Sequence, residues 1–220
     1  AQLVGSSSYI DSVNTAVART SFADWMGVVR LFYRDKAREL HLGARHVGEK
    51  FRDEIGYQDY AGVTYRRLGH FFERHTESAL GVQLRQDWLN PVGLYHTEAR
   101  ERISTTREDE VGQTMTSAFA QSEIEWTRTL RTMVGLRMDA YRFSVTADNP
   151  LNSGDGSESM FSPKVGAVFG PWSGTELYAN WGKGFHSNDA RGAVISVDPV
   201  SGEPAEPVTP SVRARGAEFG

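Results

Sequence analysis

Side chains that could hold a metal or a phosphate occur in this chain as isolated pairs and short runs. His96 and Glu98 form an H-x-E pair, but no third ligand follows nearby in the sequence, so a zinc-type site is not expected. The acidic run DNPLNSGDGSE, from Asp148 to Glu158, offers oxygen ligands. Its spacing matches no EF-hand, so we interpret it as a solvated turn.

The remaining patterns do not predict catalysis either. The tripeptide GKG at 182–184 lacks the preceding glycine of a P-loop, and no helix signal follows it. Serine, histidine and aspartate residues are present, but none lies in a nucleophile-elbow context. We therefore expect no catalytic residues, no metal and no cofactor, and we predict that the protein is not an enzyme.

The stretch TELYANWGKGFHSNDARG, from Thr175 to Gly192, indicates which elements would position binding residues instead. It begins as an alternating apolar and polar strand and ends as a polar loop containing glycine. A strand that is rich in aromatic residues and opens into a long polar loop fits ligand binding at a rim better than catalysis in a packed core.

Composition limits the class of protein. The chain has 220 residues, of which 22 are glycine, and it has a net charge of −4 and no cysteine. The glycine content favours turns and strands over a helical bundle, and the charge lacks the basic excess of a nucleic-acid binder. No apolar run reaches the length of a transmembrane helix, whereas a transmembrane β-barrel stays polar on its inner face and in its loops.

From Gln58 onward the sequence alternates with a period of two, which predicts strands. One face is apolar, and the opposite face carries charges such as Glu123, Arg137 and Lys164. A last strand is expected to begin near Val212. The expected apolar face consists of Ala61, Val63, Tyr65, Leu80, Val82, Leu84, Trp88, Ala118, Ala120, Ile124, Trp126, Val134, Leu136, Met138, Ala140, Pro163, Val165, Ala167, Phe169, Leu177, Ala179, Trp181 and Phe185.

The connections between these strands alternate in length. Short turns are expected at 127–129 and 170–174, and long loops at 90–109, 146–159 and 188–211. This alternation is typical of an up-and-down meander whose two rims face different compartments. Tryptophans near strand ends and a charged opposite face fit a membrane barrel with a hydrated lumen. A soluble β-sandwich or adhesin-like module, with its charged face in bulk water, fits the same spacing.

Residues 1–57 are harder to interpret. The segment DWMGVVRLFYRD reads as a strand, whereas RDKARELHLGARHVGEKF, from Arg34 to Phe51, suits a short helix or an irregular loop. We therefore expect this part to be either uncertain strands or an irregular segment of the same sheet. The chain starts without an initiator methionine and stops within an apparent strand, so we expect a segment of a longer protein.

From about Arg67 the chain resembles the barrel of a TonB-dependent outer-membrane receptor. The blocks that carry the resemblance are AFAQSEIEWTRTLRTMVGLRMDAYRFSV, FSPKVGAVFGPWSGTELYANWGKGFHSNDARGA and RARGAEFG, in the family's order and register, and the loop GLYHTEARERISTTRED precedes them. The resemblance covers about two thirds of the chain. It implies an all-β, antiparallel up-and-down meander that forms an incomplete segment of a 22-stranded transmembrane β-barrel, with about seven to nine strands fitting this length.

The resemblance also implies a location and partners. The chain would lie in the outer membrane of a Gram-negative bacterium, in contact with lipid and lipopolysaccharide, and would serve energised uptake of a scarce, bulky ligand such as a metal chelate. The TonB complex would act through a plug domain that is absent from this sequence, and no nucleic acid is involved. Loop and rim side chains would contact the small-molecule ligand. These candidates are Tyr95, His96, Arg100, Arg102, His186, Asn188, Asp189 and Arg191.

Overall fold

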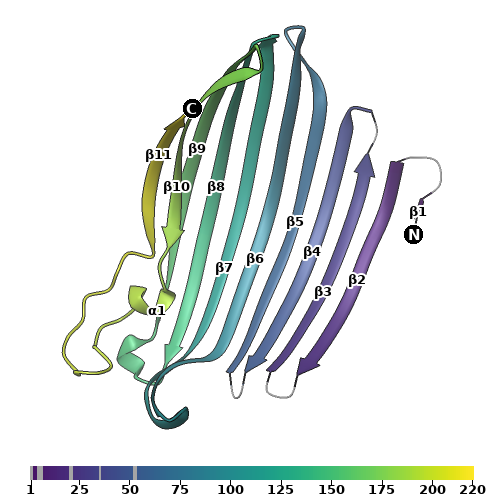
Figure 1. Cartoon of the computed structure of the whole chain (residues 1–220). Helices are drawn as coiled ribbons and strands as arrows, with labels where there is room; N and C mark the ends of the chain where they lie inside the picture. Colours follow the sequence, from purple (N-terminus) through teal and green to yellow (C-terminus); the bar gives the residue numbers. More distant parts are fainter. Residues whose placement is uncertain (1, 4–6, 20–21, 35, 52–53) are drawn as a thin grey trace.

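A computed structural model describes the backbone of residues 2–3, 7–19, 22–34, 36–51 and 54–220. Side chains are described for residues 32–34, 36–48 and 54–220. Within this part the chain is almost entirely strand, and Figure 1 shows one curved sheet with an open edge on either side.

The strands follow one another in chain order (Figure 1). Their bounds are β1 Gln2–Leu3, β2 Ser7–Arg19, β3 Phe22–Arg34, β4 Arg38–Phe51, β5 Glu54–Phe71, β6 Arg74–Glu98, β7 Glu101–Thr127, β8 Leu130–Ala147, β9 Gly154–Trp172, β10 Thr175–Ser187 and β11 Ser211–Phe219. A 3₁₀ helix, η1, spans Pro150–Asn152, and a short α-helix, α1, spans Ala190–Ala193. Neither of these helical segments of the described chain is long and apolar enough to cross a membrane.

Each strand pairs antiparallel with its sequence neighbours, which gives a sheet of 11 strands in the described part of the chain. The predicted all-β meander is confirmed, and the described part has more strands than the seven to nine expected because β1, β2, β3 and β4 precede β5. The described chain forms one layer, so the β-sandwich alternative, which needs a second sheet over the apolar face, is wrong.

The apolar face of the sheet is uncovered. Leu80 is 57% exposed, Leu136 is 48% exposed and Leu177 is 53% exposed. Each of them nevertheless has a paired residue on a neighbouring strand. Val82, Leu84, Val134, Met138, Val165 and Trp181 are exposed on the same face. A continuous apolar band of this kind requires lipid or another apolar phase to cover it.

Aromatic side chains border this band. Trp88 stacks on Tyr57 with ring centroids 5.3 Å apart, and Tyr57 stacks on His46 at 5.9 Å, across β6, β5 and β4. The indole nitrogen of Trp88 donates a hydrogen bond of 2.8 Å to Glu110. Near the opposite strand ends, Trp172 packs edge-on against Phe169. Rings that combine an apolar body with a polar contact are typical of the membrane–water interface.

Glycines on the inner face accept large side chains from the neighbouring strand. Gly81 pairs with Phe119, and a Cβ atom at Gly81 would lie 2.7 Å from that ring. Gly156 pairs with Phe143, and a Cβ atom there would lie 2.5 Å from its ring. The absence of a side chain at these two positions lets the aromatic rings lie flat against the wall.

The prediction of a helix or irregular loop over Arg34 to Phe51 was wrong, because β4 occupies most of this segment. Leu40, Leu42 and Ala44 lie at alternate positions of β4, and they pair with Tyr65, Val63 and Ala61 of β5. Glu39, His41 and Arg45, at intervening positions, pair with Arg66, Thr64 and Tyr60 and lie on the opposite, polar face of the sheet.

The connections also differ from the expected bounds. β6 and β7 continue as a long hairpin, so the expected loop at 90–109 is reduced to the turn formed by Ala99 and Arg100. Both turn residues have positive φ, 47° and 70°, as a tight two-residue hairpin turn requires. The other wide connections are 148–153 and 188–210, at the lower end in Figure 1, whereas 128–129 and 173–174 are short. β11 begins at Ser211, as expected.

A small packed core forms where the wide connections meet the inner face. Val111, Tyr141, Phe143, Val145 and Met160 are buried there together with Ala190 of α1. Phe185 packs against the same core, so its expected position on the outer apolar face is wrong. The pairing of β9 with β10 ends at Lys164 and Gly182, and beyond this point β10 pairs only with β11. Because β9 no longer constrains this end of β10, its side chains can turn inward.

Candidate functional site

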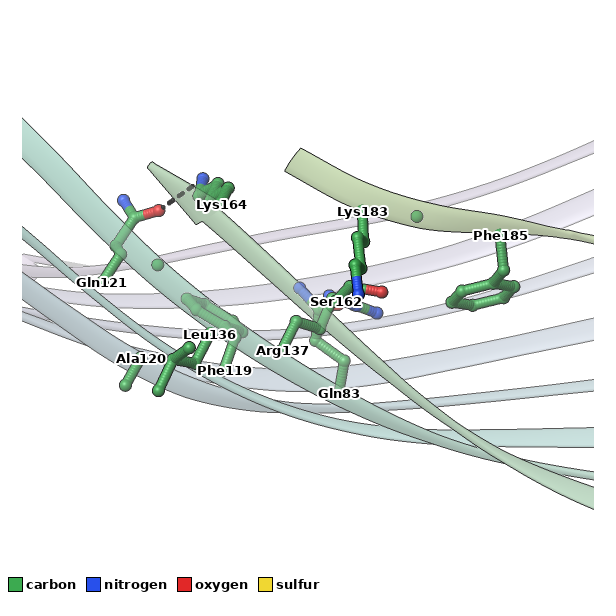
Figure 2. A pocket seen from close by; sticks show the side chains of 12 residues that line it. Gln83, Phe119, Ala120, Gln121, Leu136, Arg137, Ser162, Lys164, Lys183 and Phe185 are labelled. Atoms are coloured by element: carbon green, nitrogen blue, oxygen red, sulfur yellow. Dashed lines mark hydrogen bonds between the residues drawn. The ribbon is translucent and has the colours of Figure 1, made fainter. Parts of the chain in front are cut away.

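A concavity of about 470 Å³ lies where β10 separates from β9 (Figure 2). Its walls come from β6, β7, β8, β9 and β10, because the sheet brings the middle of these strands side by side. The polar groups that line it include three cationic side chains, two amides and a hydroxyl, and two phenyl rings complete the wall. These residues are Arg137, Lys164, Lys183, Gln83, Gln121, Ser162, Phe119 and Phe185.

A buried carboxylate fixes the guanidinium group of Arg137. Its Nε atom lies 2.9 Å from Oδ1 of Asp139, and Asp139 is fully buried. Asp139 also accepts a hydrogen bond of 2.5 Å from Ser117, which accepts one of 2.7 Å from Arg137. Arg137 further donates to Gln83 at 3.0 Å. This network joins β6, β7 and β8 and holds the cation at one position on the inner wall.

Lys164 reaches the concavity across a glycine. Gly135 is its cross-strand partner, and a Cβ atom at Gly135 would collide with the Lys164 side chain. The ammonium group donates a hydrogen bond of 3.0 Å to Gln121 on β7 (Figure 2). Any larger residue at 135 would displace the lysine stem from this path.

The third cation comes from the other side of the concavity. Figure 2 shows Lys183 and Phe185 extending from β10 toward the strands that carry Ser162 and Arg137. Converging cations with amide and hydroxyl donors can hold an anionic group through charge-assisted hydrogen bonds, and the phenyl rings can contact a flat apolar part of the same ligand.

Two of the predicted rim residues meet on the β6–β7 hairpin. The guanidinium carbon of Arg102 lies 3.3 Å from the ring centre of Tyr95, and the hydroxyl of Tyr95 donates a hydrogen bond of 3.0 Å to Glu108. Burial, followed by this hydrogen bond, raises the pKa of Tyr95. His96 and Arg100 are exposed nearby, at the strand end and in the turn.

Three other predicted residues meet in the β10–β11 connection. Asp189 caps α1 by accepting a hydrogen bond from the backbone of Arg191, and the two side chains form an ion pair of 2.6 Å. The bond from Arg191 lowers the pKa of Asp189. Asn188 donates to the carbonyl of Thr209 at 2.8 Å, which closes the base of the connection. His186 lies on β10, exposed, opposite Val212.

The β10–β11 connection is fastened to the β8–β9 connection by a residue that sequence reasoning missed. Asn152 is 1% exposed, donates to the carbonyl of Val197 at 2.9 Å, and accepts from the amides of Ser196 and Val197 at 2.9 Å each. One side chain thereby satisfies three backbone groups of a segment 44 residues away in the sequence. An asparagine in a polar turn gives no local signal of this burial.

A second missed feature is a buried ion pair on β7. Arg107 donates to Asp109 at 2.5 Å, and the Asp109 side chain is fully buried. Burial is the largest influence on the Asp109 carboxyl and raises its pKa, although Arg107 and Arg191 act in the opposite direction. Asp109 pairs with Ala147, the last residue of β8, so the pair lies at the loop end of the sheet.

A family model described as "TonB dependent receptor-like, beta-barrel" matches residues 5–214. No curated protein matches the chain significantly. Among solved structures, the alcaligin outer-membrane receptor FauA from Bordetella pertussis aligns with a TM-score of 0.64 and 16% identity over 90% of this chain and 33% of its own.

Two further solved structures share the fold. The ferric citrate transporter FecA in its unliganded form aligns with a TM-score of 0.58 and 11% identity, over 74% of this chain and 28% of its own. The ferric yersiniabactin uptake receptor FyuA from Yersinia pestis aligns with a TM-score of 0.53 and 12% identity, over 76% of this chain and 28% of its own. The chain thus spans about a third or less of the length of these structures.

Proposed function

Because the chain belongs to the TonB-dependent receptor β-barrel family, whose members are outer-membrane proteins of Gram-negative bacteria, we propose that it forms part of the wall of an uptake receptor. The ligand would be scarce and bulky, such as a metal chelate. The three similar structures are named for alcaligin, ferric citrate and ferric yersiniabactin, which supports this class of ligand.

The uncovered apolar band carries the proposal. In the described chain a single layer exposes leucine, valine and methionine side chains on one face and carries the Arg137–Asp139 network on the other. Lipid stabilises the first face, and a hydrated lumen removes much of the cost of charge on the second. A sheet wall between lipid and lumen is the part of a receptor that this geometry fits.

Energy and partners follow from the family. Uptake would draw on the TonB complex, acting through a plug domain elsewhere in the receptor, and the outer band would contact lipid and lipopolysaccharide. The segments 148–153 and 188–210 would face the outside medium, and 128–129 and 173–174 the periplasm, because wide connections carry binding residues. The chain would bind and pass its ligand without a chemical step.

The ligand contacts would come from the rim and from the inner wall. Arg102 on Tyr95 and the three cations around the concavity offer charge and aromatic surface to an anionic, conjugated chelate. The rim residues proposed to contact ligand are Tyr95, His96, Arg100, Arg102, His186, Asn188, Asp189 and Arg191.

Radiolabelled iron uptake tests the proposal. In the parent bacterium, deletion of the receptor gene should abolish uptake of one chelate among ferric citrate, ferric alcaligin and ferric yersiniabactin, and deletion of tonB should abolish the same uptake. Complementation with the Arg102→Ala variant should lower uptake at limiting ligand, whereas Arg213→Ala, a change on the outermost strand of the described sheet, should not. Unchanged uptake of all three chelates after gene deletion contradicts the assignment to metal chelates.

A further inference from the structure

Two histidines face each other at the end of the sheet that carries the short turns. His70 of β5 pairs directly with His75 of β6, and their ring centroids are 4.7 Å apart. The turn between them is only Phe72 and Glu73, so the two strands bring the imidazoles together without a long loop. Both side chains are exposed, which leaves their ring nitrogens accessible from the lumen side.

Carboxylates from the next strand lie on the same face. Thr76 pairs with Ile124, and Glu77 pairs with Glu123. The β6–β7 register ends at Thr76 and Ile124, so Glu125 and His75 are the next residues beyond it on their two strands. Both of them line the same concavity as His70 of the third strand. Successive strands lie about 4.8 Å apart, a spacing that lets neighbouring side chains reach a common ion.

The charges here are incompletely balanced. Glu77 and Glu123 are directly opposite each other, an arrangement of like charges that destabilises a sheet. Arg66 lies 3.2 Å from Glu77, but no hydrogen bond or ion pair of Glu123 or Glu125 is found in the described part of the chain. The histidines, the three glutamates and Lys36 line one concavity of about 460 Å³.

We propose that this concavity, the short-turn histidine site, binds one divalent cation of the class that accepts imidazole nitrogen and carboxylate oxygen, such as Zn²⁺, Ni²⁺ or Cu²⁺. His70 and His75 are the nitrogen ligands, and Glu125 or Glu123 supplies oxygen. In the described chain no three such side chains already converge on one point, so binding turns a glutamate side chain toward the imidazoles. The cation would also relieve repulsion between the facing carboxylates.

This site is separate from the proposed uptake of a chelate. It lies at the opposite end of the strands from Tyr95, Arg102 and the β10–β11 connection. A resident cation there would join β5, β6 and β7, and would thereby stiffen the rim where the turns are shortest. Failure of the uptake experiment would not contradict the cation site. Failure of the cation-binding experiment would likewise not contradict uptake of a chelate.

Isothermal titration of the complete, tag-free receptor with Zn²⁺ alone, after removal of metal by a chelator, tests the site. One equivalent should bind to the native receptor. His70→Gln combined with His75→Gln should weaken this binding by at least about 10–100-fold, the usual scale for damage to a metal site. Glu125→Gln should weaken it less, and the matched control His46→Gln, on β4 and on the same face as Leu42 and Ala44, should leave it unchanged.

Electron paramagnetic resonance with Cu²⁺ identifies the ligands independently. The native receptor should show coupling to two imidazole nitrogens, and each single histidine variant should show one. Zn²⁺ should also protect His70 and His75 of the native protein from acylation by diethyl pyrocarbonate, a readout that needs no variant to fold. Zn²⁺ binding that is absent, or that is equal in the native receptor and the double variant, overturns the proposal, as does acylation unaffected by Zn²⁺.

Discussion

The Nε atom of Arg137 lies 2.9 Å from Oδ1 of Asp139, whereas Met138, between them on β8, is 58% exposed on the other face. These three consecutive residues therefore show both faces of the sheet. Arg137 and Asp139 belong to a charged network on the inner face, and the apolar side chain of Met138 is uncovered on the outer face. The sheet separates two environments, and the period of two along each strand assigns every side chain to one of them.

Removal of the cation from this pair should destabilise the receptor. Arg137→Met leaves the fully buried Asp139 with Ser117 as its hydrogen-bond partner and should lower the free energy of unfolding by about 3 kcal/mol. Urea unfolding of the receptor in lipid vesicles measures this. Adding Asp139→Leu to the same protein should recover part of the loss. A single variant as stable as the native receptor would show that the network carries no stability.

The aromatic–glycine contact should be sensitive to one added side chain. Gly81→Val would press against Phe119 and against the carbonyl of Val63, each 2.7 Å from the new Cβ atom. The expected loss of stability is about 1–3 kcal/mol. Gly43→Val is the matched control, since nothing lies within 4 Å of its Cβ position. Equal unfolding midpoints for the two variants would contradict the close packing.

Asn152 should hold the β10–β11 connection in place. Asn152→Ala removes all three hydrogen bonds to residues 196 and 197, and each backbone group left unpaired costs about 1–3 kcal/mol. Limited proteolysis on intact cells should therefore cut within residues 198–208 at least about tenfold faster. The control is Asn149→Ala, because Asn149 only caps η1 through the amide of Leu151. The same cleavage rate in both variants would rule out the fastening role.

The ion pair in that connection predicts a dependence on pH. The pKa of Asp189 is lowered chiefly by the hydrogen bond from Arg191, so its stabilisation is present above the ordinary aspartate pKa of about 3.9 and is lost as the pH falls through the lower folded value. The pKa of Asp109 is raised, so its dependence on pH is the reverse. The stabilisation from its protonated form is present at low pH and is lost as the pH rises through the pKa of the folded state. Neither effect involves a group inside the apolar band.

Hydrogen exchange at the amide of Gly192, which bonds to the carbonyl of Asp189, measures the result. After correction for intrinsic rates, protection in the native receptor should persist from pH 7 to pH 5. Asp189→Asn should lose protection over that whole range, because the charge-assisted bonds to Arg191 are gone. Protection that falls steeply near pH 6 in the native receptor would contradict the lowered pKa.

The alternation of side chains was enough to predict the wall of the sheet, including the outward positions of Leu80, Leu136 and Leu177, because burial in a strand depends on local periodicity. It was not enough where contacts join distant segments. Asn152 is held by a connection that folds back from residues 188–210, and the Arg107–Asp109 pair is buried at the same end of the sheet. No local sequence pattern indicates either burial.

The errors have the same origin. The charges of the segment from Arg34 to Phe51, together with Leu40 and Leu42, favoured a helix or an irregular loop, whereas pairing with β5 makes most of the segment a strand. Phe185 continued the apolar alternation of β10, but it turns inward where pairing with β9 ends. Tyr95 and Arg102 were expected at the rim, yet their stacking depends on the two-residue turn at Ala99 and Arg100, which composition alone did not predict.

Lipid contact along β8 tests the central claim most directly. This sequence contains no cysteine. Once any cysteines elsewhere in the receptor are replaced, single cysteines at 134–138 can each carry a spin label in the receptor reconstituted in vesicles. Labels at Val134, Leu136 and Met138 should relax faster with oxygen, which concentrates in lipid, and labels at Gly135 and Arg137 should respond to a water-soluble nickel reagent. An alternation of period two is the predicted result. Equal exposure to the aqueous reagent at all five positions would show that lipid does not cover this face.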